Sequence, residues 1–301
     1  MKKISRSAII TNGNITPVIV NYYIEKGFAV ADSLFTKNEV QEIRDECIQI
    51  FRGNRGNVEG ILPVPGGLDD FGIIRRYNAI HFPHKISETI LKYVKHPKVA
   101  RVLKTIVSQN VKCMQSMLFV KGPGKPGQSW HQDEYYIPTR DRSLTGAWIA
   151  IDDADVDNGC LWVIPGSQRD GFIHKIVPSE SNEYNEQYSC ELIPFIEDDA
   201  IPVEVKTGSV VFFNGYLLHR SLKNKTPDRS RMALVSHYMS AESMLPWNWD
   251  GRITLKEDMR DIIMITGKDP YAEKGTESIT FPYLRGEQSS NGIPAGPGKN
   301  K

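Results

Sequence analysis

The chain has 301 residues, of which 40% are hydrophobic and 24% are charged, a composition that is ordinary for a globular protein. Its formal net charge of +1 gives no sign of a surface for nucleic acid or for an anionic membrane, and no apolar run reaches the ~20 residues of a membrane span. These properties favour a soluble, cytoplasmic protein. The length allows one large domain or two small ones, and we expect a single domain over residues 1–301.

The cysteine pattern and the start of the chain support this interpretation. The cysteines are far apart and form no CxxC pair, which argues against a zinc knuckle and a disulfide scaffold and fits a reducing compartment. The apolar stretch near the start, 8–10, is too short for a signal peptide.

The first third of the chain, residues 16–110, is predicted to form a helical support. Thr36 and Glu39 have the spacing of a capping box, and the apolar residues that follow recur at helical spacing. A second helix is predicted to start at Pro97, because proline is favoured in the first turn of a helix. The glycine- and proline-rich stretch 53–72 is predicted to be a long loop.

From residue 111 the pattern changes to short β runs separated by turn signals. Many short strands with such punctuation predict a mainly β fold, with a double-stranded β-helix (jelly-roll or cupin-like) core over 111–240 and flanking helices. The predicted strands are 111–120, 145–152, 160–164, 203–206, 209–213 and 231–239.

Three further segments lie outside this core. Residues 174–202 lack clear periodicity and are interpreted as an insertion that forms a lid. Residues 241–286 are predicted to be a C-terminal extension, and residues 287–301 a disordered tail because they are rich in glycine, proline and polar residues. We expect the insertion and the extension to shape a substrate pocket.

A candidate metal site is formed by His131, Asp133 and His219. Alternate residues of an extended segment point to one face, so His131 and Asp133 can reach one metal while Gln132 points away. His219 follows a β run and must be brought close by the fold. Two imidazoles and one carboxylate leave positions open on an iron(II) ion for oxygen and a co-substrate.

Two alternatives remain open from these residues alone. The histidines can be structural, and the same ligand set also suits catalytic zinc. Arg231 favours iron with an organic acid, because a guanidinium offers a two-pronged anchor for a carboxylate. The remaining histidines are interpreted as structural or, at most, as lining the pocket: His81, His84, His96, His174 and His237.

The chain resembles the phytanoyl-CoA dioxygenase family over about residues 20–240, most strongly over 114–239. The resemblance implies a jelly-roll enzyme that uses iron(II) and 2-oxoglutarate, and it does not specify the substrate. It rests on His131-Gln132-Asp133, on Asn158-Gly159-Cys160-Leu161 with Ile164-Pro165-Gly166-Ser167, and on His219-Arg220-Ser221 with Arg231.

The resemblance also implies roles for individual residues. His131, Asp133 and His219 match the iron ligands. Arg231 matches the arginine that pairs with the distal carboxylate of 2-oxoglutarate, with Arg229 as the alternative.

Five further residues are matched to the co-substrate pocket. Ser221 matches a hydroxyl beside the distal carboxylate, Trp148 an aromatic wall and Met117 a packing contact. Gln132 is a further candidate contact to the co-substrate. Asn78 stands where the family's phytanoyl-CoA hydroxylase has a lysine, which counts against phytanoyl-CoA as the substrate.

For some other residues, a role at the pocket and a role in ordinary packing or at the surface both remain open. Tyr135 and Tyr136 can line the pocket, and Trp247 and Trp249 can cap it, or they can simply pack. For Arg140, Arg142 and the acidic stretch 152–157, a solvated surface is favoured over an anion or calcium site.

The predicted function is hydroxylation of a small or medium organic substrate with O2, coupled to conversion of 2-oxoglutarate to succinate and CO2. Asp133 favours hydroxylation because related halogenases have a small residue at that position. A cupin-like zinc or manganese hydrolase or isomerase and a non-catalytic jelly-roll binding module are the competing hypotheses. Neither the substrate nor the oligomeric state is specified by the sequence.

Overall fold

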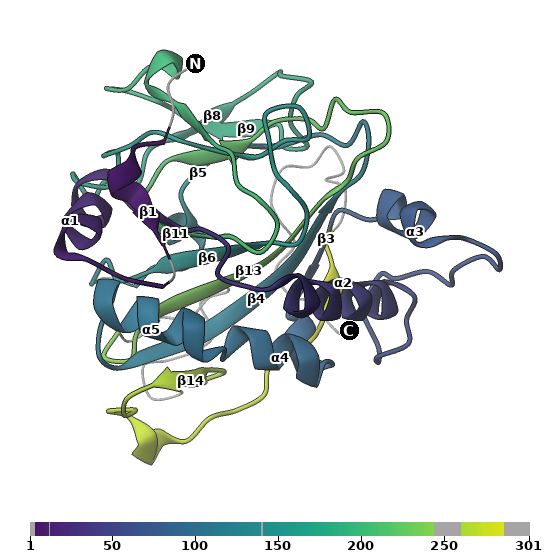
Figure 1. Cartoon of the computed structure of the whole chain (residues 1–301), viewed down its shortest axis with the longest axis horizontal. Helices are drawn as coiled ribbons and strands as arrows, with labels where there is room; N and C mark the ends of the chain where they lie inside the picture. The colour runs from purple at the N-terminus through teal and green to yellow at the C-terminus, as the bar shows by residue number, and fades with distance from the viewer. Residues whose placement is uncertain (1–3, 12, 140, 244–259, 286–301) are drawn as a thin grey trace.

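A computed structural model describes residues 4–11, 13–139, 141–243 and 260–285, and Figure 1 shows their arrangement. The core is a jelly roll of two sheets. The strand order of the large sheet is β1-β2-β11-β6-β13-β4-β3-β15, with β14 also paired to β4. The smaller sheet has the order β10-β7-β12-β5, and β8 and β9 form a separate two-stranded sheet.

The bounds of the large-sheet strands are β1 Ile9–Ile10, β2 Phe28–Ala31, β3 Ala79–His81, β4 Val111–Lys121, β6 Thr145–Ala150, β11 Val210–Asn214, β13 Arg231–Ser240, β14 Ile263–Thr266 and β15 Tyr283–Leu284. The other strands are β5 Gln128–His131, β7 Leu161–Val163, β8 Ile176–Pro178, β9 Tyr188–Cys190, β10 Ile201–Val203 and β12 His219–Ser221.

The helices are α1 Pro17–Lys26, α2 Lys37–Phe51, α3 Asp70–Arg76, α4 Glu88–Val94, α5 Pro97–Ile106 and α6 Asp133–Tyr136. Short 3-10 turns are η1 Arg6–Ala8, η2 Pro83–Lys85, η3 Glu197–Asp199 and η4 Ala272–Lys274. No helix in the described ranges is both long and apolar enough to cross a bilayer.

Two of the predicted helices are found where expected. Helix α2 starts with the predicted capping box, in which the Thr36 hydroxyl accepts from the backbone of Glu39 and the Glu39 carboxylate accepts from the backbone of Thr36. Helix α5 starts at Pro97 as predicted. The predicted loop 53–72 is three residues too long, because α3 begins at Asp70, where the Asp69 side chain caps Gly72.

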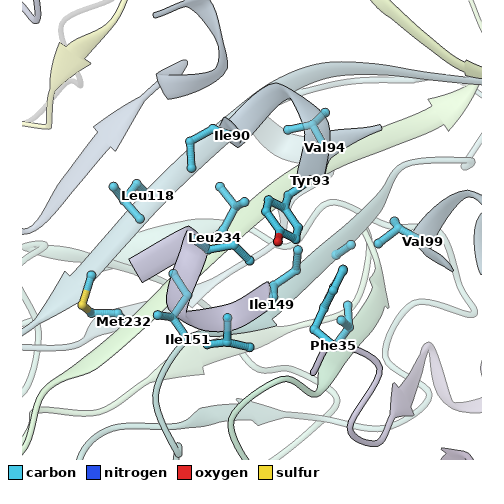
Figure 2. Packing of buried hydrophobic residues seen from close by; sticks show 14 of the residues in the cluster. Phe35, Ile90, Tyr93, Val94, Val99, Leu118, Ile149, Ile151, Met232 and Leu234 are labelled. Carbon is cyan, nitrogen blue, oxygen red and sulfur yellow. The ribbon is translucent and has the colours of Figure 1, made fainter. Parts of the chain in front are cut away.

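The large sheet is buried on both faces, and alternation along its strands separates two clusters. Met232 and Leu234 of β13, together with Ile149 of β6, face the helices in one cluster with Tyr93. Figure 2 shows these side chains packed below Ile90 and Val94 of α4. The intervening residues face the interior of the jelly roll in a second cluster, which includes Met117, Trp148, Ala233 and Val235. This alternation decides which side chains can reach the site.

Strand β10 shows the largest shift among the predicted strands. The structure places it at Ile201–Val203, whereas the sequence predicted 203–206. Its register is set by pairing with β7, where Val203 lies opposite Leu161, and not by its own apolar pattern. The predicted insertion 174–202 contains the β8–β9 hairpin, which Figure 1 shows beside β5.

Candidate metal centre and co-substrate pocket

The three predicted metal ligands lie together at one end of the interior. His131 ends β5, Asp133 starts α6 and His219 starts β12, and one ligand atom from each lies within 4.8 Å of the others. The Asp133 Oδ1 atom is 3.8 Å from His131 Nε2 and 3.6 Å from His219 Nε2. All three side chains are buried.

Pairing between strands brings the two histidines together. His219 and His131 are direct partners in the antiparallel pair of β12 and β5. The prediction that Asp133 continues the extended segment was wrong, because the extended backbone ends at Gln132 and Asp133 begins a helical turn. The turn still directs the Asp133 carboxylate toward the histidines.

Backbone carbonyls fix the tautomer of both histidines. His131 Nδ1 donates to the carbonyl of Ser129 at 2.7 Å, and His219 Nδ1 donates to the carbonyl of Leu217 at 2.9 Å. In the neutral imidazoles each Nε2 therefore presents a lone pair to the shared centre. Burial lowers the pKa of His131 to about 3, which keeps its ring neutral and available as a ligand.

Asp133 is oriented by His237, which lies on β13. His237 Nε2 donates to Asp133 Oδ2 at 3.1 Å and leaves Oδ1 to face the two ligand histidines. Burial alone would raise the pKa of Asp133, but His219, His237 and this hydrogen bond outweigh burial and hold the pKa below its usual value. The donor set thus matches the needs of a divalent metal that prefers nitrogen and oxygen ligands.

The predicted co-substrate residues lie along the same interior. Met117 and Trp148 are buried in the interior cluster, and the Arg231 guanidinium lies 5.6 Å from the centre of the Trp148 ring. Arg231 Nε donates to the carbonyl of Gly159 at 3.2 Å. Burial lowers the pKa of Arg231 to about 10, so the guanidinium stays charged at neutral pH.

The geometry distinguishes between Arg231 and Arg229, the two candidates for the carboxylate anchor. Arg229 forms a two-pronged ion pair with Asp155 at the surface, where its side chain is 41% exposed. A guanidinium already paired in this way is a poor anchor for a second carboxylate. The arrangement therefore favours Arg231.

Two of the predicted co-substrate contacts, Gln132 and Asn78, are held by hydrogen bonds within the protein. Gln132 is fully buried, and its amide donates to the carbonyls of Phe172 and Tyr216 and accepts from the backbone of His174. These three bonds hold the amide in place, so Gln132 braces the motif, and both of its N–H groups are already used. Asn78 lies just before β3, and its carbonyl accepts from the backbone of Val120 on β4.

The other residues that were considered for the pocket lie in different environments. Tyr135 is half exposed, whereas burial raises the pKa of Tyr136 to about 12. Arg142 lies over the Tyr216 ring, and Asp153 pairs with Lys206, as expected of a surface turn. Arg140, Trp247 and Trp249 lie outside the described residues.

The sequence predicted no specific role for three residues near the site, of which His237 was interpreted only as structural or pocket-lining. His237 and Lys121 both lie on interior-facing positions, since they share the strand alternation of Arg231 and Met117, and this parity was available in the sequence. The third is Arg285 of the C-terminal segment, which pairs with Glu186 at 2.8 Å.

Hydrogen bonds to the backbone of Ser129 connect the Arg285–Glu186 ion pair to the metal ligand His131. Glu186 accepts from the backbone of Ser129 at 3.1 Å, and the carbonyl of Ser129 holds His131. The β8–β9 hairpin and the C-terminal segment therefore meet beside a candidate metal ligand. No pattern in either segment predicted this long-range contact.

Comparison with known proteins identifies related chains. The family model for phytanoyl-CoA dioxygenase matches residues 23–233. A phytanoyl-CoA dioxygenase of Arabidopsis thaliana is 23% identical over 280 residues, covering 82% of this chain and 97% of the relative. A phytanoyl-CoA dioxygenase domain-containing protein 1 of Danio rerio is 36% identical over 174 residues, covering 54% and 57%.

Solved structures share the fold. The α-ketoglutarate-dependent carbocyclase SnoK from nogalamycin biosynthesis has a TM-score of 0.62 and 20% identity, covering 84% of this chain and 97% of SnoK. EctD from S. alaskensis, solved with 2-oxoglutarate and 5-hydroxyectoine, has a TM-score of 0.59 and 19% identity, covering 77% and 78%. These matches support the predicted jelly-roll fold.

Proposed function

The chain belongs to the phytanoyl-CoA dioxygenase family, and we propose that it hydroxylates a small or medium organic substrate while converting 2-oxoglutarate and O2 to succinate and CO2. The observation that carries the proposal is the buried His131, Asp133 and His219 cluster in the same interior as Arg231. A hydrolytic zinc site has no general need for the buried arginine.

The protein's own contribution is to hold and orient the reacting groups. His131, Asp133 and His219 would hold iron(II). The carbonyls of Ser129 and Leu217 orient the two imidazoles, and His237 orients the Asp133 carboxylate. When bound, iron(II) and 2-oxoglutarate supply the oxidising chemistry that places an oxygen atom from O2 on a substrate C–H bond.

The pocket beside the metal selects the co-substrate. Arg231 pairs with the distal carboxylate of 2-oxoglutarate, and Ser221 adds a hydrogen bond to it. Trp148 and Met117 form the apolar wall, which excludes water and strengthens the ion pair. The Asp133 carboxylate fills the position that a halide would need, so hydroxylation is the favoured outcome.

The substrate pocket is shaped by the β8–β9 hairpin and the C-terminal segment. Glu186 and Arg285 bring these two segments together beside His131. Neither segment contains any of the three candidate iron ligands, so different side chains in these segments would let one metal centre serve different substrates.

The proposal is tested by measuring succinate. Anaerobically purified protein is supplied with iron(II) and 2-oxoglutarate, and succinate is measured with and without O2, with His131→Ala as the control. We expect oxygen-dependent succinate that disappears in the variant, followed by stimulation when substrate candidates are screened. Absence of succinate together with tight zinc binding that does not depend on 2-oxoglutarate would favour a hydrolase or isomerase.

A further inference from the structure

Two buried cations lie side by side at the end of the interior opposite the metal ligands. Lys121 of β4 and Arg231 of β13 are direct partners in the antiparallel pair, and both are about 5% exposed. They also share a neighbour. Arg231 Nε donates to the carbonyl of Gly159, and a β-carbon added to Gly159 would lie 3.0 Å from Lys121 Nζ.

Neither cation has a carboxylate partner in the part of the chain that the structure describes. Within the described ranges, no ion pair joins Lys121 or Arg231 to an acidic side chain. A buried arginine is usually paired with a carboxylate. Arg260 is an example, since it is equally buried and its Nη2 atom contacts both carboxylate oxygens of Asp269 at 2.7 Å. Like charges opposite one another in a sheet are unfavourable, and burial adds a desolvation cost. An anionic ligand would remove both penalties.

The hydrogen bonds of Ser221 point to the same ligand. Lys121 Nζ donates to Ser221 Oγ at 2.8 Å, and the backbone of Gln128 donates to the same oxygen at 3.3 Å. A serine oxygen has two lone pairs, and these two donors occupy both of them. The Ser221 hydroxyl hydrogen is therefore left to donate, and it has no acceptor among the described residues.

We propose that Lys121 is the second cation of the co-substrate anchor, where it faces the distal carboxylate of 2-oxoglutarate beside Arg231 and holds Ser221 as a donor to that carboxylate. The proposal rests on the proposed function and extends it to a residue with no assigned role. It also gives the anchor a preference for a dicarboxylate over a keto acid that has only one carboxylate.

Lys121 supplies a charge that Asn78 cannot. Asn78 is uncharged, and its carbonyl accepts from the backbone of Val120, the residue before Lys121. The positive charge beside Arg231 therefore comes from Lys121 of β4.

The test compares two keto acids by calorimetry on the anaerobic iron(II) protein. The probes are 2-oxoglutarate and 2-oxobutyrate, which lacks the distal carboxylate. We expect Lys121→Met to weaken 2-oxoglutarate binding at least about tenfold, because a hydrogen bond between charged groups contributes ~1.5–3 kcal/mol. Binding of 2-oxobutyrate should not change, and Lys121→Arg should recover most of the affinity for 2-oxoglutarate.

Two further variants complete the test. Lys206→Met is the matched control, because Lys206 is 80% exposed and pairs with Asp153 on the surface, and it should bind both acids normally. Ser221→Ala should weaken 2-oxoglutarate alone, and it keeps the proposal testable if Lys121→Met does not fold.

The possible results separate this proposal from the proposed function. Equal weakening of both keto acids would assign Lys121 a purely structural role, and unchanged binding of 2-oxoglutarate would remove it from the anchor. Either result would overturn the inference while leaving the oxygenase function intact. If the unmodified protein binds no 2-oxoglutarate, the proposed function itself fails.

Discussion

The two ends of the jelly-roll interior differ in how their charges are balanced. At the metal end, the Asp133 carboxylate is surrounded by three histidines, and backbone carbonyls hold two of the rings. At the other end, Arg231 and Lys121 lie together without an acidic partner in the described part of the chain. At the metal end the carboxylate is balanced by internal contacts, whereas the other end is positively charged.

This difference shows how one interior can bind two unlike ligands. The metal end is rigid because its hydrogen bonds are already made, so a metal ion meets ligands that need little rearrangement. The cationic end keeps unused donors and gains stability when an anion arrives. Variants at the metal end should therefore weaken metal binding, and variants at the cationic end should weaken co-substrate binding.

The largest effect is expected when the metal end loses its carboxylate. Asp133→Ala removes the anionic ligand, and we expect iron affinity to fall more than about 100-fold, beyond the ~10–100-fold typical of residues that only orient a ligand. Iron(II) titration of the metal-free protein measures this loss, with circular dichroism as the folding control. A variant that still binds one iron tightly would remove Asp133 from the ligand set.

A smaller effect is expected when Asp133 keeps its carboxylate but loses its orientation. His237→Leu removes the donor to Asp133 Oδ2, and we expect iron affinity to fall ~10–100-fold. His237→Gln restores an N–H donor and should recover part of that loss. The same iron titration checks both variants, and equal affinities for Leu and Gln would show that His237 only fills space.

At the cationic end, co-substrate binding should weaken as pH rises. Burial, and then the charge of Arg231, hold the pKa of Lys121 well below its usual value. An anion beside Lys121 raises that pKa again, so binding takes up a proton. The contribution of Lys121 is fully present below the pKa of the free protein and is lost as pH rises through the pKa of the complex.

Calorimetry in two buffers of different ionisation enthalpy measures this proton uptake. The affinity for 2-oxoglutarate should fall by at most about tenfold per pH unit, and Lys121→Met should flatten the curve. The other groups facing Lys121 are Arg231, Ser221 and Cys160, with Glu183 and Glu186 of the hairpin farther away. Burial raises the pKa of Cys160 to about 12, so the thiol stays neutral. An unchanged slope in the variant would assign the titration to another group.

The smallest effect is expected far from both ends. Thr36→Ala breaks the capping box of α2, and we expect the free energy of unfolding to fall by about 1 kcal/mol. Urea denaturation measures this change. Iron and 2-oxoglutarate binding should stay the same, and a change in either would mean that α2 is coupled to the site.

Local patterns in the sequence were sufficient for much of this structure. The capping box at Thr36 and the proline at 97 marked two helices, and the β run from Arg231 marked strand β13. The family match confirms the predicted family, the enzyme class and the iron and 2-oxoglutarate cofactors, while the predicted role of each site residue stays a prediction.

The features that could not be predicted depend on contacts between distant segments. Strand β10 takes its bounds from β7, and Gln132 is satisfied by backbone groups at 172, 174 and 216. The contact between Glu186 and Arg285 joins residues ninety-nine positions apart. Neither segment has a periodic pattern that reveals its partner, because a single ion pair leaves no repeat in the sequence.

The C-terminal segment also protects the edge of the large sheet. Beside β4, the chain places β14 along its first residues and β3 along its later ones, and β15 then covers β3. Both C-terminal strands lie beyond residue 233, where the family match ends. Without residues 260–285, the start of β4 and the outer side of β3 would offer unpaired N–H and C=O groups to other chains. A protein that ends after residue 243 should therefore aggregate, even though it keeps β13 and every candidate iron ligand.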